Sequence, residues 1–190
     1  MSRKVKRVRY YLEPSEKKLT MDELKIILRG ADELIMRGGR GLLAKILKGS
    51  KDKVITEKKL ERCPVYGAFK DLTVKKITEK IDRGIVDSYL AIEYDYRLPL
   101  LVFTDKGWKI EMDTYSDELL KEFDELLEKG PPFDMNYLKD RNRSMILLLL
   151  DKVAATKDSK YIPLLESWEK IDYRKVREKI NWVIEKITGF

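Results

Sequence analysis

A basic stretch around residue 50 has the composition of a phosphate-binding loop. Lys48, Gly49, Ser50 and Lys51 follow one another where one predicted helix ends and the next begins. A helix N-terminus presents free backbone N–H groups and a partial positive charge, and a hydroxyl and two ammonium groups beside it complete a clamp for phosphate oxygens. Ser50 would also serve as an ordinary helix cap, so phosphate binding and capping both fit the pattern.

Further lysines precede and enter a later predicted helix. Lys70 lies in the loop before this helix, Thr73 starts it, and Lys76 lies in its first turn. Lysine binds phosphate as a point charge, and the stretch has no cluster of Asn, Gln or Arg that would recognise base edges. The stretch therefore predicts phosphate contacts without base-specific recognition. Lys75 and Lys80 fit a solvated helix face equally well.

Aromatic and basic side chains gather at the tip of a predicted β-hairpin, which consists of Tyr96, Arg97 and Leu98. A tyrosine ring or a guanidinium plane can stack on an exposed base, which stabilises binding by roughly 1–3 kcal/mol per base. The tip could therefore contact the end of a duplex. Packing of the hairpin against a neighbouring element is the alternative.

The N-terminal arm is also basic. Residues 3–9 contain five Lys or Arg side chains, and no acidic residue precedes Glu13. Arms of this kind often follow a groove or a phosphate backbone. An edge strand or a flexible tail would have the same composition.

The chain contains no histidine. This absence excludes Ser-His-Asp and Cys-His nucleophile systems and every zinc motif that needs an imidazole. Glu93, Asp95, Glu111 and Asp113 are dense enough to suggest Mg²⁺, but their spacing matches no metal motif, which favours solvated charges. We therefore expect no catalytic residue, no metal and no cofactor. The single cysteine, Cys63, fits a structural thiol in a reducing, cytoplasmic compartment.

The 190 residues carry a formal net charge of +7, and the two halves of the chain differ in sign. Residues 1–83 contain 23 basic and 12 acidic side chains, whereas residues 84–190 contain 17 basic and 21 acidic ones. This distribution suggests a polyanion-binding module joined to a module with another task. A solvated surface with unevenly placed lysines would give the same counts.

Hydrophobic spacing and capping residues predict helices over about 20–36, 42–49, 51–60 and 73–83, followed by hairpin strands over about 85–96 and 100–104. Helices followed by a hairpin form the order of a winged helix. Only helices follow, over about 116–129, 134–156, 159–169 and 173–187, and Gly130-Pro131-Pro132 is a strong break and a candidate boundary. We expect an α+β winged-helix domain over residues 1–112 and an all-α domain over residues 113–190.

Three separated blocks carry a family resemblance: Leu47–Lys51, Cys63–Thr73 and Phe103–Gly107. In order and spacing they resemble the RQC domain, the winged helix found C-terminal to the motor of RecQ-type helicases, over roughly residues 19–110. The chain departs from those helicases because it has no G-x-x-x-x-G-K-[ST] motif, no four-cysteine zinc subdomain and no HRDC-like segment. It resembles a stand-alone RQC-type protein, which is not expected to unwind DNA by itself.

The resemblance implies that Lys48 and Ser50 contact the DNA backbone and that the helix after Thr73 occupies the recognition-helix position. In some RQC domains an aromatic residue at the wing tip stacks on the terminal base pair and helps to split it, and here Arg97 stands at that position. The implied function is non-catalytic binding of duplex, branched or forked DNA, mainly through phosphates, with a link to repair or recombination.

The C-terminal helices resemble a HEAT-type hairpin over Ser159–Ile187, with Asp172 before the second helix and Val176 and Arg177 inside it. A single repeat is short, so the preceding helices would have to complete the stack. Such a tail would dock a protein partner. The alternative function is therefore a protein-interaction adaptor in which the winged helix serves as a scaffold. The longest apolar run, Met145–Leu150, predicts no membrane span, which needs roughly 20 residues.

Overall fold

The computed structural model describes residues 6–189 and divides the chain into two compact units, Met1–Glu111 and Met112–Phe190. Each unit has its own cluster of buried apolar side chains. The boundary falls inside a long helix, so the break at Gly130-Pro131-Pro132 lies within the second unit.

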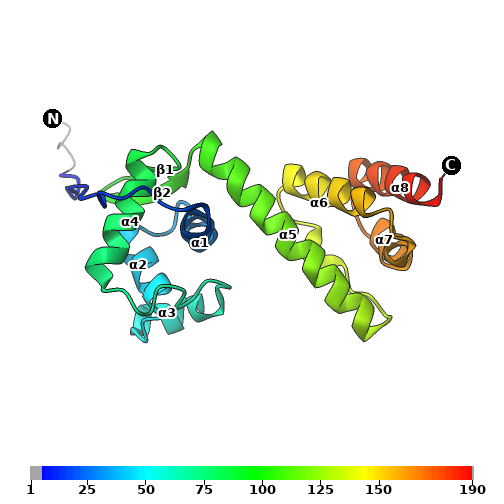
Figure 1. The fold of residues 1–190 in the computed structure, drawn as a ribbon, viewed down its shortest axis with the longest axis horizontal. Coiled ribbons are helices and arrows are strands. Elements are labelled where there is room, and N and C mark those ends of the chain that lie inside the picture. The colour runs from blue at the N-terminus through cyan, green and yellow to red at the C-terminus, as the bar shows by residue number, and fades with distance from the viewer. Residues whose placement is uncertain (1–5, 190) are drawn as a thin grey trace. The chain divides into compact units, whose positions relative to one another are not determined.

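The first unit is a winged helix (Figure 1). Its elements in chain order are the helices α1 (Met21–Asp32), α2 (Arg40–Lys48), α3 (Lys53–Glu57), the 3-10 turn η1 (Leu60–Arg62), α4 (Val74–Val86), and the strands β1 (Leu90–Asp95) and β2 (Leu98–Phe103). The predicted α+β fold class is confirmed.

Helix α1 begins as the sequence predicts and ends earlier. The Thr20 hydroxyl accepts the N–H of Glu23, and the Glu23 carboxylate accepts the N–H of Thr20, which completes a capping box. After α1 the chain pairs with the wing, because Met36 N–H donates to Leu101 O and Leu101 N–H donates to Gly38 O, both at 3.0 Å. These bonds compete with further helix, so the helix does not reach residue 36.

Helix α4 continues through Gly84 to Val86, and β1 begins only at Leu90. The predicted strand start at residue 85 is therefore wrong, because Ile85 and Val86 still belong to the helix. On the inner side of α4, Ile77 and Ile81 are fully buried in the core of the first unit. This orientation turns the opposite side of α4 outward.

The wing is a two-stranded antiparallel hairpin. Its register pairs Asp95 with Leu98, so Tyr96 and Arg97 form a two-residue loop. The expected turn at Arg97–Pro99 is shifted, because Leu98 and Pro99 already belong to β2. A two-residue loop is the commonest hairpin connection, and Tyr96 accommodates it with a φ of 50°.

The second unit consists of helices. It contains the C-terminal part of α5 (Asp105–Lys129), the 3-10 turn η2 (Asn136–Leu138), α6 (Arg143–Thr156), the 3-10 turn η3 (Ser159–Tyr161), α7 (Ile162–Glu169) and α8 (Arg174–Thr188). The helix expected over 134–156 starts only at Arg143, because the Asn142 side chain caps it there by accepting N–H groups of Ser144 and Met145.

The core of the second unit surrounds Trp168, whose ring meets that of Phe123 edge to face with centroids 5.8 Å apart. The HEAT-type resemblance of this unit stays a prediction. Among residues 6–189, every helix is too short or too polar to span a bilayer.

Candidate nucleic-acid interface

Main-chain hydrogen bonds fasten the loop before α4 to the C-terminal end of α2. Gly67 N–H donates to Ile46 O at 2.9 Å, and Phe69 N–H donates to Leu47 O at 2.8 Å. The last carbonyl groups of a helix lack donors within the helix, and here N–H groups of the loop donate to two of these carbonyl groups. The first two family blocks therefore form one interlocked structure.

Side chains strengthen the same contact. The Lys48 ammonium donates to the carbonyl oxygen of Lys70, and the Tyr66 hydroxyl donates to the carbonyl oxygen of Ser50 at 2.9 Å. We call the set Lys48–Lys51, Lys70 and Thr73 the basic corner. The structure thus brings together residues from two separate stretches that the sequence analysis predicted as DNA contacts.

Gly49 ends α2 in the left-handed conformation, with a φ of 73°. Its N–H donates to Ile46 O, and the N–H of Ser50 donates to Lys45 O, both at 2.9 Å. A Cβ atom at Gly49 would lie 3.1 Å from the Cα atom of Gly67. Both the backbone conformation and the close approach of the loop therefore favour glycine at this position.

Ser50 does not cap the next helix, and the expectation of an open helix end at this serine is wrong. Its N–H is already bonded to Lys45, and its Oγ accepts the N–H of Asp52 at 3.2 Å. Asp52 is the residue that directly precedes α3, and it forms an ion pair with Lys45 at 2.6 Å. The ion pair with Lys45 and, to a smaller degree, a hydrogen bond from the Ser50 side chain hold the pKa of Asp52 below its ordinary value, so a phosphate would have to compete with Asp52 for the Ser50 hydroxyl.

Three exposed ammonium groups at or beside the basic corner are available for a ligand. They belong to Lys51, Lys70 and Lys76, and none of them has an ion-pair partner in the described part of the chain. Lys76 lies one helical turn beyond Thr73, whose Oγ1 accepts the Lys76 N–H at 3.2 Å and caps α4 as predicted. The first turn of α4 has no acidic residue, so the positive helix end adds to these charges.

The other two lysines of α4 have partners. Lys80 donates to Glu23 of α1 at 2.6 Å, and Lys75 approaches Glu79 at 3.9 Å. Burial raises the pKa of Glu23, but the hydrogen bonds from Lys80 and Thr20 outweigh burial and hold this pKa below its ordinary value. Lys80 therefore joins two helices, and only Lys75 remains largely solvated.

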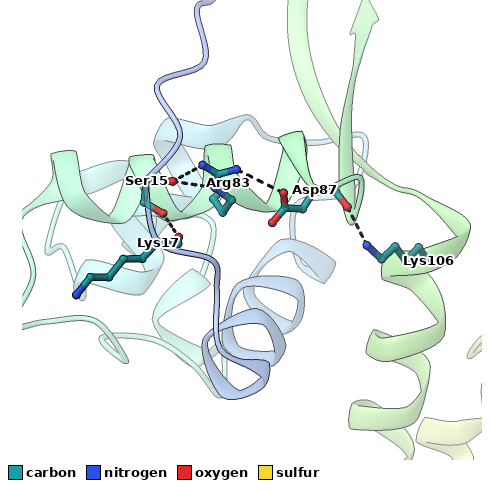
Figure 2. A network of polar contacts seen from close by, with 5 residues as sticks. All are labelled: Ser15, Lys17, Arg83, Asp87 and Lys106. Carbon is teal, nitrogen blue, oxygen red and sulfur yellow. Dashed lines mark hydrogen bonds and ion pairs between the residues drawn. The ribbon is translucent and has the colours of Figure 1, made fainter.

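Residues 8–17, which we call the strap, run from the wing, where Val8 N–H donates to Arg97 O, to the outward side of α4 (Figure 2). Ser15 N–H donates to Glu79 O at 2.9 Å, and Arg83 Nε donates to Ser15 O at 2.8 Å. Glu79 and Arg83 lie on the side of α4 opposite Ile77 and Ile81, which face the core. The strap therefore covers part of the surface that a recognition helix presents to the major groove, and Val74, Lys75 and Lys76 at the start of α4 stay exposed.

A buried ion pair anchors the strap. Asp82 is only 1% exposed, and it accepts hydrogen bonds from Arg40 Nη1 at 2.5 Å and from the Glu13 N–H at 2.8 Å. The same Arg40 nitrogen donates to the carbonyl oxygen of Tyr11 at 3.1 Å. These bonds satisfy a carboxylate that would be costly to bury alone.

Arg83 extends this network toward the start of α5 (Figure 2). Its Nη1 lies 3.5 Å from an Asp87 carboxylate oxygen, and Lys106 Nζ donates to the Asp87 carbonyl oxygen at 3.0 Å. On the strap, the Ser15 hydroxyl donates to Lys17 O at 2.8 Å. The strap, α4 and the first turn of α5 are thus joined within the first unit.

The third family block also has a structural role. Thr104 Oγ1 donates to Ser88 O at 2.7 Å and accepts the N–H of Gly107 at 3.1 Å, directly before α5. A Cβ atom at Gly107 would lie 1.9 Å from the carbonyl oxygen of Tyr89. Only glycine fits there, which explains why the block is recognisable in sequence.

The wing tip forms a second, separate cluster of predicted contact residues. Tyr96 is 69% exposed and Leu98 is 57% exposed, and the Arg97 guanidinium lies 5.9 Å from the centre of the Tyr96 ring. Val8 N–H donates to Arg97 O at 3.0 Å, and Tyr94 OH donates to Val8 O at 2.7 Å. Within residues 6–189, no hydrogen bond or ion pair joins this tip to the basic corner.

The basic arm lies beside the wing where it is described. The Arg7 guanidinium is 4.9 Å from the centre of the Tyr94 ring, and Lys6 and Arg9 are exposed. The first part of the arm, Arg3–Val5, lies outside the described residues.

The candidate metal ligands do not form a site in the described residues, where no group of three or more His, Cys, Asp or Glu side chains could hold an ion. Glu111 is buried, and Asp113 forms an ion pair with Lys152 at 2.8 Å. Glu93 and Asp95 are exposed on the wing, and Cys63 is a buried free thiol.

Sequence reasoning missed two residues that position this surface. Tyr66 holds the Ser50 carbonyl, and its only signal was its place inside the second family block. Arg40 anchors the strap, but no local pattern marks it, because its partner Asp82 lies 42 positions away.

A family model of the RQC domain matches residues 14–116, which is more than half of the 190 residues and includes all three blocks, the basic corner and the wing. No curated protein and no solved structure matches the chain at a significant level. The RQC family comprises non-catalytic DNA-binding domains. With its winged-helix fold and the interlocked blocks, this chain belongs to the RQC domain family.

Proposed function

We propose that the chain binds double-stranded DNA, as duplex or as branched molecules, mainly through phosphate contacts and without catalysing a reaction. One observation carries the proposal: the interlock of α2 with the loop before α4 places Lys48, Ser50 and Lys70 at one corner. The ammonium groups of Lys51 and Lys70 are available there, and a phosphate oxygen can accept from each of them.

The strap supports phosphate contacts over base recognition. Ser15 covers α4 at Glu79 and Arg83, on the side that would enter the major groove. The exposed N-terminal turn of α4 offers Thr73, Lys76 and backbone N–H groups, which recognise phosphates but not base identity. Binding should therefore depend weakly on sequence.

The wing adds a contact with DNA ends. Tyr96 is exposed at the tip, and a tyrosine ring can stack on the last base pair of a duplex or on a base at a fork. Asp95 beside it is exposed and would repel phosphate, which favours contact with bases over contact with the backbone at this point.

Charge reversal at the available lysines tests the proposal. The test variant is Lys51→Glu, Lys70→Glu and Lys76→Glu combined, and the matched control is Lys109→Glu, Lys121→Glu and Lys129→Glu, all exposed and without ion-pair partners among the described residues. Lys48 is left unchanged, because its ammonium holds the Lys70 carbonyl and its loss would disturb the fold.

Fluorescence anisotropy with blunt duplex, forked and quadruplex DNA gives the affinities. We expect wild-type binding to weaken steeply with salt, since each neutralised phosphate releases counterions, and we expect the test variant to lose at least about tenfold in affinity. The control should lose much less. Equal losses in both variants, or binding that does not respond to salt, would contradict the proposal, and absence of binding to all DNA forms would favour the adaptor function.

The wing contact has its own test. Tyr96→Ala should weaken binding to a blunt duplex by about five- to tenfold, the loss of one stacked base. It should leave binding to the same duplex with both ends closed by hairpin loops unchanged. An equal effect on open and closed ends would rule out stacking of Tyr96 on the terminal base pair.

A further inference from the structure

The second unit concentrates its positive charge in two short segments. Residues 139–143 and 170–177 together contain seven basic and two acidic side chains, whereas residues 112–129 of α5 contain two basic and seven acidic ones. The unit is therefore strongly divided by charge along its sequence, although the second half of the chain is slightly acidic as a whole.

The fold brings the two basic segments together. A hollow of about 250 Å³ is lined by Lys139, Arg141 and Arg143 from the first segment and by Tyr173 and Val176 from the second. The hollow lies where α6 begins and where α8 begins, and these two helices pack against each other (Figure 1, yellow and red). Lys139, Arg141 and Arg143 line the hollow, and Arg174, Lys175 and Arg177 lie in the first turn of α8, next in sequence to Tyr173 and Val176. We call these six cations the basic edge.

Several of these cations have no acidic partner. Arg143, Lys175 and Arg177 are exposed and form no ion pair within the described residues. Lys139 Nζ lies 5.3 Å from the centre of the Tyr173 ring. Such uncompensated charge is available to a ligand.

The acidic groups near the basic edge compensate only part of its positive charge. Asp172 is 9% exposed, and its carboxylate accepts hydrogen bonds from Trp168 Nε1 at 2.7 Å and from the Tyr173 N–H at 2.6 Å. Glu178 is held by Arg174 at 2.8 Å. Asp140 is exposed and is the remaining carboxylate beside the hollow.

An exposed aromatic ring lies among these charges. Tyr173 is 54% exposed and lines the hollow with the cations around it. Cations interleaved with an exposed aromatic side chain suit a nucleic acid, whose phosphates and sugars alternate along the strand and whose bases stack on rings.

We propose that the basic edge is a second DNA-binding surface, which holds the sugar-phosphate backbone through the cations around Tyr173. The choice of DNA among polyanions rests on the proposed function of the first unit. The helical unit would then contribute directly to DNA affinity, in addition to any protein contact that it makes.

Charge reversal in the full-length chain tests this inference. The edge variant combines Arg143→Glu, Lys175→Glu and Arg177→Glu, and the control is again Lys109→Glu, Lys121→Glu and Lys129→Glu, which changes the net charge equally. Circular dichroism and thermal unfolding establish that the variants are folded. On a 30-base-pair duplex we expect the edge variant to bind at least about tenfold more weakly and its salt slope to fall by up to about 3, or 0.9 for each lost phosphate contact.

The two proposals fail in different ways. An edge variant that binds with the affinity and salt slope of the control overturns this inference and leaves the proposed function of the first unit standing. If the edge variant weakens binding and the Lys51, Lys70 and Lys76 variant does not, this inference stands and the basic corner fails.

A measurement on the wild-type chain supplies a second readout. Lysines are acetylated with acetic anhydride, with and without the duplex, and the sites are quantified by mass spectrometry. Acetylation of Lys175 should fall at least about threefold in the presence of DNA, whereas Lys121 and Lys129 on acidic α5 should be unaffected. Unchanged acetylation of Lys175 would overturn the inference.

Discussion

The two units use their charged side chains in different ways. In the first unit the Asp82 carboxylate is buried in its ion pair with Arg40, while other pairs, such as Lys53 with Glu57, are exposed. In the second unit the carboxylates of pairs such as Arg174 with Glu178 and Lys152 with Asp117 remain more than half exposed. The comparison teaches that counting lysines and arginines overstates the ligand-binding charge of the first unit, because part of that charge fastens the strap and α1 to α4. In the second unit the nearly neutral total of charged side chains hides the local excess of positive charge at the basic edge.

The largest expected loss of stability comes from a substitution whose new Cβ atom would clash with the backbone, so no side-chain movement can relieve the clash. Gly107→Ala would place a Cβ atom 1.9 Å from the Tyr89 carbonyl oxygen, so α5 must shift from the wing. We expect the free energy of unfolding of the first unit to fall by at least about 4 kcal/mol, measured by urea unfolding. Gly41→Ala is the control, since a Cβ atom at Gly41 meets nothing within 4 Å. Equal stabilities of the two variants would show that α5 can move without cost.

The next effect compares a buried ion pair with an exposed one. Arg40→Ala leaves the Asp82 carboxylate buried without its cation, and we expect a loss of about 3 kcal/mol in the free energy of unfolding. Arg174→Ala removes an exposed partner of Glu178 in the second unit and should cost less than about 0.5 kcal/mol. Thermal and urea unfolding measure both. Similar losses in the two variants would remove the distinction drawn between the units.

A smaller effect should appear at the interlock of the basic corner. Tyr66→Phe removes the hydrogen bond to the Ser50 carbonyl oxygen, at a cost of about 1 kcal/mol in stability. Because Ser50 and Lys51 lose their support, the affinity for duplex DNA should fall about threefold. Tyr11→Phe is the matched control, because Tyr11 is 76% exposed. If Tyr66→Phe lowers stability but leaves DNA affinity unchanged, the hydrogen bond of Tyr66 to Ser50 supports the fold and does not contribute to DNA binding.

The smallest effect concerns acid. The pKa of Glu23 lies below its ordinary value of 4.5, because hydrogen bonds from Lys80 and Thr20 outweigh the effect of burial. A carboxylate with a lowered pKa stabilises the fold above its ordinary pKa, and this stabilisation disappears as the pH falls through the lowered value. Glu23→Gln keeps the side-chain oxygen of the capping box and removes the charge.

Wild type should therefore exceed Glu23→Gln in stability by at most about 1 kcal/mol at pH 7, and the difference should vanish as the pH falls below about 4.5. Urea unfolding at pH 7, 5 and 3 measures the difference. A difference that grows with acid would mean that Lys80 contributes nothing to the pairing of α1 with α4.

Much of the fold could be predicted because its signals are local. Thr20 and Thr73 cap the helices that follow them, and Gly49 ends α2, as the sequence indicates. A threonine before an amphipathic run, or a glycine after one, acts within a single turn, so a short window contains the whole interaction. The order of helices and wing follows from such signals.

The rest depends on distant partners. Ser50 fits the role of a cap in sequence, but Asp52 precedes α3 instead, and the Ser50 N–H turns back to Lys45. No local pattern predicts the strap, because it is anchored by the ion pair of Arg40 with Asp82. A local sequence pattern cannot predict a pair whose members lie 42 positions apart. For the same reason, the sequence did not indicate that the two segments of the basic edge lie together.

The approach of Gly49 to Gly67 has a consequence for evolution and engineering of this surface. Main-chain atoms, without an intervening side chain, define the gap between the two segments, so backbone packing and backbone hydrogen bonds fix the spacing of the loop from the end of α2. Lysines around this contact can be exchanged, added or removed to tune affinity, while a single methyl group on Gly49 would push the two segments apart.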